Sequence, residues 1–266
     1  AKTLFPYTTL FRSSLACIPV TAEGKAKLLV KDNGIIAGVA FAKMIFDYVD
    51  KGMVVETFIN DGETVKYGDV VFHVSGSSQS ILKAERLVLN SMQRMSAIAT
   101  KTKMFVDLLA GTQTKILDTR KTTPGMRLLE KYAVRMGGGT NHRMSLSDAA
   151  LIKDNHIAAA GGVSQAFSAV RGAYPSAPIE IEVDTLDQLR EVLPLKPDLV
   201  LLDNMSPALC AEAVAIVAGA TKLEASGGIS LENARAYAES GVDFIAIGAL
   251  THSAAVLDIG LDLRAE

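Results

Sequence analysis

Short apolar segments recur through the second half of the sequence, and each of them ends in polar residues. They are KILDT (115–119), ALIKD (150–154), IEIEVD (179–184), DLVLLDN (198–204), KLEASGG (222–228) and FIAIGA (244–249). Helix-like stretches such as 185–193 and 206–218 lie between them, and several begin at Ser or Thr, which cap helix N-termini. Strand followed by helix, repeated in this way, predicts a parallel sheet, and a barrel is the commonest way to bury it. Because only six such strands are evident, we expect an incomplete barrel.

The first hundred residues follow a different pattern. Strand-like runs occur at KAKLLVKD (25–32), MVVETFIN (53–60) and DVVFHVSG (69–76), and helix-like stretches occur at 40–49 and 81–111. Turn signals in NDGETVKYGDV (60–70) predict bends between strands. Two styles of sequence therefore meet near residue 100, which indicates an α/β protein with two parts.

Composition narrows the class of protein. The chain has 266 residues, enough for one large α/β barrel or two smaller domains, and its net charge is -2. Such a charge argues against a broad basic surface, so we expect no nucleic acid and no membrane as partner. Cys17 and Cys210 lack metal-ligand spacing and are expected to be buried in a reducing compartment. Neither a membrane-spanning run nor a signal or transit pattern is evident, which predicts a cytoplasmic enzyme.

The strand ends predict where the chemistry lies, because catalytic groups of such barrels gather at the C-terminal ends of the strands. Cations come first along the chain: Arg120, Lys121, His142, Arg143 and Lys153. Arginine grips carboxylates in a bidentate manner and lysine offers a mobile charge to phosphate, so we expect a substrate with both groups. The structural alternative is an ion-pair network with the aspartates at 118, 148 and 154.

Carboxylates and glycines occupy the later strand ends. Glu182 and Asp203 end adjacent strands, where they would hold Mg²⁺ with ribose hydroxyls or stabilise positive charge on a sugar ring. The alternative is that each pairs with a neighbouring lysine. Ser226-Gly227-Gly228, with residues 229–231 opening a helix and Gly248 near the sixth strand, favours a phosphate-binding loop. No histidine pair has metal-ligand spacing.

These residues lie within a longer stretch that resembles a known family. The segment LDTRKTTPGMRLLEKYAVRMGGGTNHRMSLSDAALIKDNHI (117–157) strongly resembles the signature of the quinolinate phosphoribosyltransferases. AERLVLNSMQRMSAIAT (84–100), IEIEVD, LVLLDN, EASGGI and IAIGALTHSA (245–254) match the same family in order. The resemblance covers the chain from about Gly24 to Leu263.

The resemblance implies a fold and an assembly. The fold is type II phosphoribosyltransferase-like: an N-terminal α/β sandwich domain over 1–99, to which 258–266 return, and a catalytic, incomplete α/β barrel over 100–257. The implied assembly is a homodimer with shared active sites, or a higher assembly of such dimers.

It also implies an activity in NAD biosynthesis. A glycosyltransferase (pentosyltransferase) of this family transfers phosphoribosyl from phosphoribosyl pyrophosphate to quinolinate, releasing nicotinate mononucleotide, pyrophosphate and CO₂. The implied catalytic residues are Lys121, Lys153, Glu182 and Asp203, the last two also contacting Mg²⁺ indirectly, with phosphoribosyl pyrophosphate. The implied substrate-binding residues are Arg86 from the partner subunit, Arg120, His142, Arg143, Ser226, Gly227, Gly228 and Gly248.

One segment departs from the family pattern, and other functions stay open. TLFPYTTLFRSS (3–14) replaces a helical and acidic stretch, so we expect a truncated or corrupted start that affects activity and assembly more than fold. A related phosphoribosyltransferase of altered substrate is the first alternative. The second is a non-catalytic lipoyl- or biotinyl-type module, suggested by DGETVKYGDVV (61–71), although Lys66 precedes its turn. The third is a barrel aldolase with a Schiff-base lysine at Lys153 or Lys222.

Overall fold

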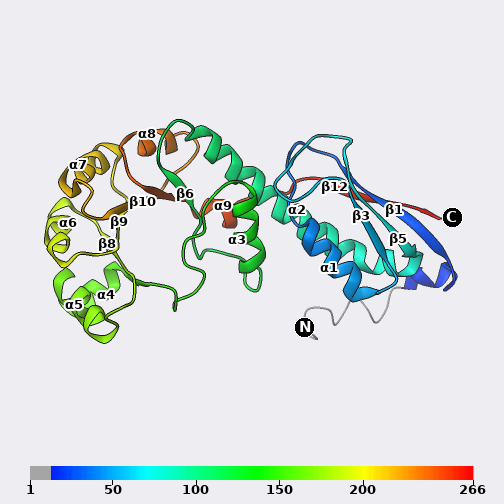
Figure 1. Cartoon of the computed structure of the whole chain (residues 1–266), viewed down its shortest axis with the longest axis horizontal. Coiled ribbons are helices and arrows are strands. Elements are labelled where there is room, and N and C mark those ends of the chain that lie inside the picture. The colour runs from blue at the N-terminus through cyan, green and yellow to red at the C-terminus, as the bar shows by residue number, and fades with distance from the viewer. Residues whose placement is uncertain (1–12, 266) are drawn as a thin grey trace. The chain divides into compact units, whose positions relative to one another are not determined.

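The computed structural model describes residues 13–265, which form two compact units (Figure 1). The first unit draws its described residues from Ala1–Thr100 and Ala254–Glu266, and the second is Lys101–Ser253. The ranges predicted from the sequence differ from these by a few residues at each boundary. Residues 3–12 of the segment that departs from the family pattern lie outside the described residues.

The first unit is a two-layer α/β sandwich. Its antiparallel sheet has the order β12-β1-β5-β3, formed by β1 (Glu23–Val30), β3 (Val54–Thr57), β5 (Val70–Ser77) and β12 (Ile259–Ala265). The other elements are η1 (Ser13–Cys17), β2 (Gly34–Ile35), α1 (Val39–Val49), β4 (Thr64–Val65) and α2 (Ser78–Leu108), which continues into the second unit.

The core of this unit follows from alternation along β1. Ala26, Leu28 and Val30 point to one face of the sheet, where they share a buried cluster with Phe46 of α1 and Met92 of α2. The prediction that both cysteines are buried is wrong for Cys17, which is exposed because it lies in η1 rather than in the core. Cys210 of α7 is buried, and burial raises its pKa to about 11.

The second unit is the expected incomplete barrel. Its parallel sheet has the order β6-β11-β10-β9-β8-β7, and all six predicted strands are present. They are β6 (Lys115–Leu117), β7 (Ala150–Ile152), β8 (Ile179–Val183), β9 (Leu199–Asp203), β10 (Lys222–Ser226) and β11 (Phe244–Ala246). Within the described residues β6 and β7 do not pair with each other, so the barrel stays open between its first and second strands in chain order.

Helices line the outer side of this sheet (Figure 1). They include α4 (Asp154–Ala160), α5 (Val163–Ala173), α6 (Leu186–Val192), α7 (Pro207–Val217) and α8 (Ala234–Glu239). The other described helices of the second unit are α3 (Arg127–Met136), the short η2 (Leu193–Leu195) and α9 (Ala249–His252). Thr185 caps α6 by accepting from the Gln188 N–H, and Ser206 caps α7 by accepting from that of Leu209, as their positions predicted.

Three further findings concern the helices. The sequence did not predict α3 or α4. The helix expected to open at residues 229–231 begins only at Ala234, so that part of the prediction is wrong. None of the helices in residues 13–265 is long and apolar enough to cross a membrane.

Candidate active site

A cavity of about 690 Å³ lies at the C-terminal ends of the barrel strands. Most of the predicted site residues line it: Arg120, Lys121, His142, Arg143, Lys153, Glu182, Asp203, Ser226, Gly227 and Gly228. A second cavity of about 540 Å³ shares Arg120, Arg143 and Lys153 with the first and extends along α4 and α5. The strand ends thus bring together residues that are more than a hundred positions apart in the chain.

Two predicted residues do not line this cavity. Gly248 lies next to Lys121, which does line the cavity: a Cβ on Gly248 would be only 3.0 Å from the Cδ of Lys121. The ends of β6 and β11 therefore meet through the Lys121 side chain. Arg86 belongs to α2 in the first unit, where its guanidinium is exposed and lies 3.6 Å from the Glu85 carboxylate.

Positive charge is concentrated and poorly neutralised on one side of the cavity. Burial lowers the pKa of Arg143, and the charge of Arg120 lowers it further. The Nε atom of Arg120 is buried without a hydrogen-bond partner among the described residues. Arg143 donates to the Ala149 carbonyl at 3.0 Å rather than to a carboxylate. A bound anion is the partner that such a cluster favours.

Among the described residues, none of the three aspartates of the alternative ion-pair network forms an ion pair with these cations. The Asp118 carboxylate pairs with Lys131, which the sequence analysis did not single out. Asp148 accepts the backbone N–H groups of Met144 and Ser145, which lower its pKa together with the Ser145 hydroxyl. Asp154 is exposed and caps its own turn through the Asn155 N–H.

The opposite side of the cavity carries carboxylates on adjacent strands. Glu182 of β8 accepts from the Lys153 ammonium at 2.6 Å, so the lysine-paired alternative holds for this residue. Asp203 of β9 instead accepts from its neighbour Asn204. Burial raises the pKa of Asp203, and the charges of Glu182 and Asp184 raise it further. Carboxylates that repel one another in this way favour a cationic or hydroxyl-rich ligand between them.

The glycine pair that follows β10 has a backbone that other residues rarely adopt. Gly227 and Gly228 have φ values of +99° and +61°. A Cβ on Gly227 would lie 2.1 Å from the Asn204 Oδ1, so the loops after β9 and β10 are in close contact. The structure places this glycine pair in a tight turn on the cavity wall, without the predicted helix directly behind it, and phosphate binding by the turn stays a prediction.

A buried acidic cluster lies below the rim. The Nε2 of His142 is 2.8 Å from Glu180 Oε2 and 3.4 Å from Glu224 Oε2. Burial raises the pKa of Glu224 well above its usual value, and the charge of Glu180 adds to this. Sequence reasoning missed both acids, although alternation along IEIEV places Glu180 on the same face of its strand as Glu182.

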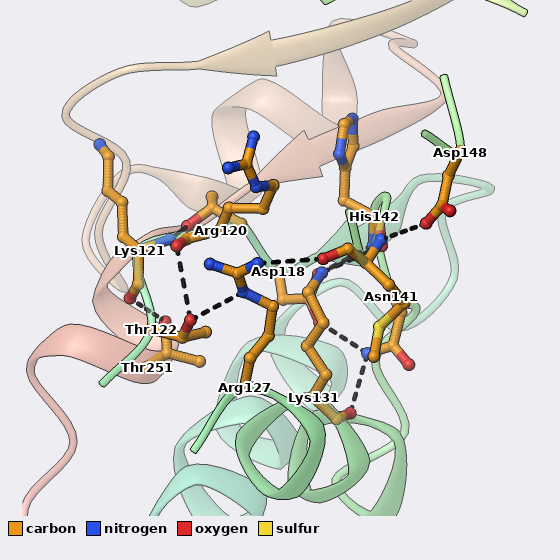
Figure 2. A network of polar contacts seen from close by, with 12 residues as sticks. Asp118, Arg120, Lys121, Thr122, Arg127, Lys131, Asn141, His142, Asp148 and Thr251 are labelled. Carbon is orange, nitrogen blue, oxygen red and sulfur yellow. Dashed lines mark hydrogen bonds and ion pairs between the residues drawn. The ribbon is translucent and has the colours of Figure 1, made fainter. Parts of the chain in front are cut away.

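A second buried group connects α3 to the two chain segments that carry Arg120 and Arg143 (Figure 2). The Lys131 ammonium donates to Asp118 Oδ1 at 2.5 Å and to the His142 carbonyl at 3.0 Å. Asn141 donates through Nδ2 to Asp118 Oδ2 and to the Lys131 carbonyl. Burial raises the pKa of Asp118 and lowers that of Lys131, while their mutual attraction opposes both shifts.

Fold and cavity together define a class: an enzyme on an incomplete α/β barrel, whose rim carries arginines and lysines on one side and carboxylates with a glycine turn on the other. Residues 98–262 match the family described as quinolinate phosphoribosyl transferase, C-terminal domain, and residues 9–96 match its N-terminal domain. The chain belongs to the quinolinate phosphoribosyltransferase family.

Individual relatives agree with this assignment. The chain is 48% identical over 253 residues to the nicotinate-nucleotide pyrophosphorylase [carboxylating] of Mycobacterium leprae (strain TN), covering 93% of this chain and 89% of that protein. It is 44% identical to a mitochondrial quinolinate phosphoribosyltransferase [decarboxylating], 2b, of Nicotiana tabacum, covering 94% of this chain and 76% of the relative. The structure of the nicotinate-nucleotide pyrophosphorylase from Francisella tularensis superimposes with a TM-score of 0.94 at 37% identity, covering 99% of this chain and 94% of that one.

Proposed function

We propose that this chain transfers phosphoribosyl from phosphoribosyl pyrophosphate to quinolinate with loss of CO₂, giving nicotinate mononucleotide and pyrophosphate. The observation that carries the proposal is the cavity itself. Arginines without carboxylate partners line one side, and carboxylates with a glycine turn line the other. Quinolinate is a dicarboxylate, and the ribosyl donor brings a phosphate, hydroxyls and a pyrophosphate. The family match supports this enzyme over the carrier-module alternative.

The cationic side suits the pyridine dicarboxylate. Arg120 and Arg143 would grip its carboxylates through their planar guanidinium groups, with His142 beside them. The ring nitrogen then attacks the anomeric carbon of the sugar while pyrophosphate leaves toward Lys121 and Lys153. Once the nitrogen carries a positive charge, it stabilises the electron pair that loss of CO₂ leaves on the adjacent ring carbon, and that carbon then takes a proton from solvent.

The carboxylate side suits the sugar. Charge develops on the ribose as the bond to pyrophosphate breaks, and fixed carboxylates stabilise such a cation. Ser226, Gly227 and Gly228 would hold the 5′-phosphate through their backbone N–H groups, with Gly248 nearby. The aldolase alternative is weakened because Lys153 is paired with Glu182, and Lys222 lies at the opposite end of its strand, paired with Asp243.

Magnesium is part of the proposal. The carboxylate pair fits a hard cation, because Glu182 and Asp203 repel each other and offer oxygen ligands on adjacent strands. Bound with phosphoribosyl pyrophosphate, Mg²⁺ would neutralise charge on the leaving group.

Variants of the two carboxylates test this side of the cavity. Glu182→Gln and Asp203→Asn should each lower kcat by roughly a hundredfold, whereas the Kd for quinolinate should change little, because the lost charge acts on the sugar and metal. Calorimetry and steady-state rates measure the two effects. Asp184→Asn, on an exposed neighbour outside the cavity lining, is the matched control. A collapse of quinolinate affinity with unchanged binding of phosphoribosyl pyrophosphate would show that the two halves of the site are exchanged.

A homodimer with shared active sites also stays a proposal, as does a cytoplasmic location. Arg86 is exposed on α2 and weakly paired, so it is free to meet a ligand held by a partner subunit. A side chain of this kind would add a third guanidinium to the quinolinate carboxylates.

Turnover decides between this function and a relative of altered specificity. Purified protein should form nicotinate mononucleotide and CO₂ from quinolinate and phosphoribosyl pyrophosphate, and it should do so far faster than it consumes nicotinate. Equal or faster turnover of nicotinate would overturn the assignment of quinolinate as substrate.

A further inference from the structure

The cations of the quinolinate-binding side come from two chain segments that flank the opening of the barrel. One segment, 118–121, follows β6 and carries Arg120 and Lys121. The other, 140–143, carries His142 and Arg143 and lies on the open edge of β6, where Thr140 forms an isolated parallel bridge with Leu117. Because β7 does not pair with β6, the sheet itself holds the second segment only through this bridge and its hydrogen bonds.

A buried ion pair joins the two segments. Asp118 and Lys131 each have fully buried side chains. The Asp118 carboxylate accepts from the Lys131 ammonium, the His142 N–H and Asn141 Nδ2, which is the hydrogen bonding of an ionised carboxylate. Lys131 also donates to the His142 carbonyl. One lysine of α3 therefore contacts both segments at once (Figure 2).

Arg127 of α3 repeats this arrangement with residues just beyond the two segments, and the buried Glu130 adds a contact on the side of the first segment. Arg127 donates through Nε to the Thr122 hydroxyl at 3.1 Å and through Nη1 to the Met144 carbonyl at 3.2 Å. Glu130 accepts from the Thr123 N–H. Helix α3 therefore also contacts the residues that follow each segment. These are Thr122 and Thr123 after the first segment and Met144 after the second.

We propose that Lys131 and Arg127 are positioning residues that set the spacing between Arg120 and Arg143, and so select a ligand with two neighbouring carboxylates. The inference deepens the proposed function and rests on it. A ligand of this kind needs its two guanidinium partners at a fixed separation. In this fold a single bridge to β6 holds the start of the second segment, at Thr140, and contacts with α3 hold the part that carries Arg143.

The burial of a charged pair, Asp118 and Lys131, between the two segments supports a positioning role for Lys131. Burying an ion pair gains little stability over apolar residues of the same volume, because desolvation offsets the attraction. A pair with this many directed hydrogen bonds does, however, fix backbone positions closely. The His142 carbonyl and N–H are both held by it, and Arg143 is the next residue.

A double variant separates positioning from stability. Lys131→Met alone leaves Asp118 buried without its counter-charge, so both the melting temperature and activity should fall. Asp118→Asn with Lys131→Met removes both charges; the new amide oxygen accepts from the His142 N–H, and the new amide NH₂ can donate to Asn141 when that side chain presents its Oδ1. We expect the double variant to regain most of the lost melting temperature, whereas its kcat/KM for quinolinate stays at least about tenfold below wild type. A double variant with wild-type kcat and KM would overturn the role of Lys131.

A milder change at the half-buried Arg127 of α3 gives a second test that leaves the buried ion pair intact. Arg127→Lys keeps the charge but cannot reach Thr122 and Met144 together. We expect an unchanged melting temperature and a KM for quinolinate that rises about tenfold, with a smaller change in the KM for phosphoribosyl pyrophosphate. Arg135→Lys, on an exposed residue of the same helix, is the matched control and should leave both constants unchanged.

The outcomes distinguish this inference from the proposed function. If the wild-type protein neither binds nor converts quinolinate, the proposed function fails. If the wild-type protein is active and Arg127→Lys has the same quinolinate KM as Arg135→Lys, the positioning role of α3 is overturned while the function stands. A rise confined to the Arg127 variant supports the inference.

Discussion

Glu224 is an acid inside a barrel whose interior is ordinarily filled by branched apolar residues. Burial and the charge of Glu180 raise its pKa above the ordinary value of 4.5, so the folded chain binds this proton more tightly than the unfolded chain. The stability that this group contributes is present below about pH 4.5 and is lost as the pH rises through the raised pKa. Glutamine has nearly the same shape as glutamic acid but does not titrate, so Glu224→Gln removes this pH dependence of the stability.

Glu224→Gln should therefore be more stable than wild type at pH 8, by a few degrees in melting temperature, and the difference should shrink toward pH 5. Thermal unfolding of both proteins across this range measures the effect. A difference that is the same at every pH would mean that Glu224 is not protonated preferentially in the folded state.

Residues at strand ends were predictable because strand direction alone brings them to one rim. Arg120, Lys153, Glu182 and Asp203 all line the cavity for this reason. Lys131 was not predictable in the same way, since a lysine on a short helix is ordinarily a surface residue. Its buried position depends on Asp118, whose side chain turns inward from the end of β6, and no local pattern in the sequence reports that pairing.

At the scale of the element, helix starts were predicted best where a side chain caps the first turn. Thr185 accepts from the Gln188 N–H, and the Gln188 side chain accepts from the Thr185 N–H in return. Thr185→Ala should cost about 1 kcal/mol, which lowers the melting temperature by roughly 2–4 °C for a chain of this size. Activity should be unchanged, because Thr185 does not line the cavity. Thr185→Ser keeps the capping oxygen and is the control; an alanine variant as stable as the serine variant would show that the cap contributes nothing.

Two departures from the predicted helices, at α3 and at the start of α8, have different physical causes. The buried side of α3 carries Glu130 and Lys131 next to Ala133 and Val134, so its inward face is not marked by apolar residues alone. Periodicity detects a helix by an apolar stripe, and here polar groups occupy part of it. The late start of α8 at Ala234 has a different origin, because the Ser230 N–H donates to Asn233 Oδ1 and the chain turns there before it becomes helical.

At the scale of the whole molecule, the shared-site assembly predicts complementation. Arg86→Ala and Lys153→Ala should each be inactive alone. Mixed after subunit exchange, half of the dimers carry one chain of each kind, and one of their two sites has both residues intact. Activity should then recover to at most about one quarter of wild type, as the symmetry of such dimers requires. Exchange is verified by tagging one variant, and exchanged mixtures that stay inactive would contradict a role for Arg86 across the subunit boundary.

The pairing of β12 with β1 has a consequence for the order in which the chain folds during synthesis. The barrel sheet has all its strands once β11 has left the ribosome, whereas β1 still lacks its outer neighbour. Until Ile259–Ala265 emerge, one edge of the sandwich sheet presents unpaired backbone groups along β1, and such an edge recruits strands from other chains. Strand β12 therefore protects the edge of β1, and a nascent or clipped chain that lacks β12 would aggregate more readily through β1.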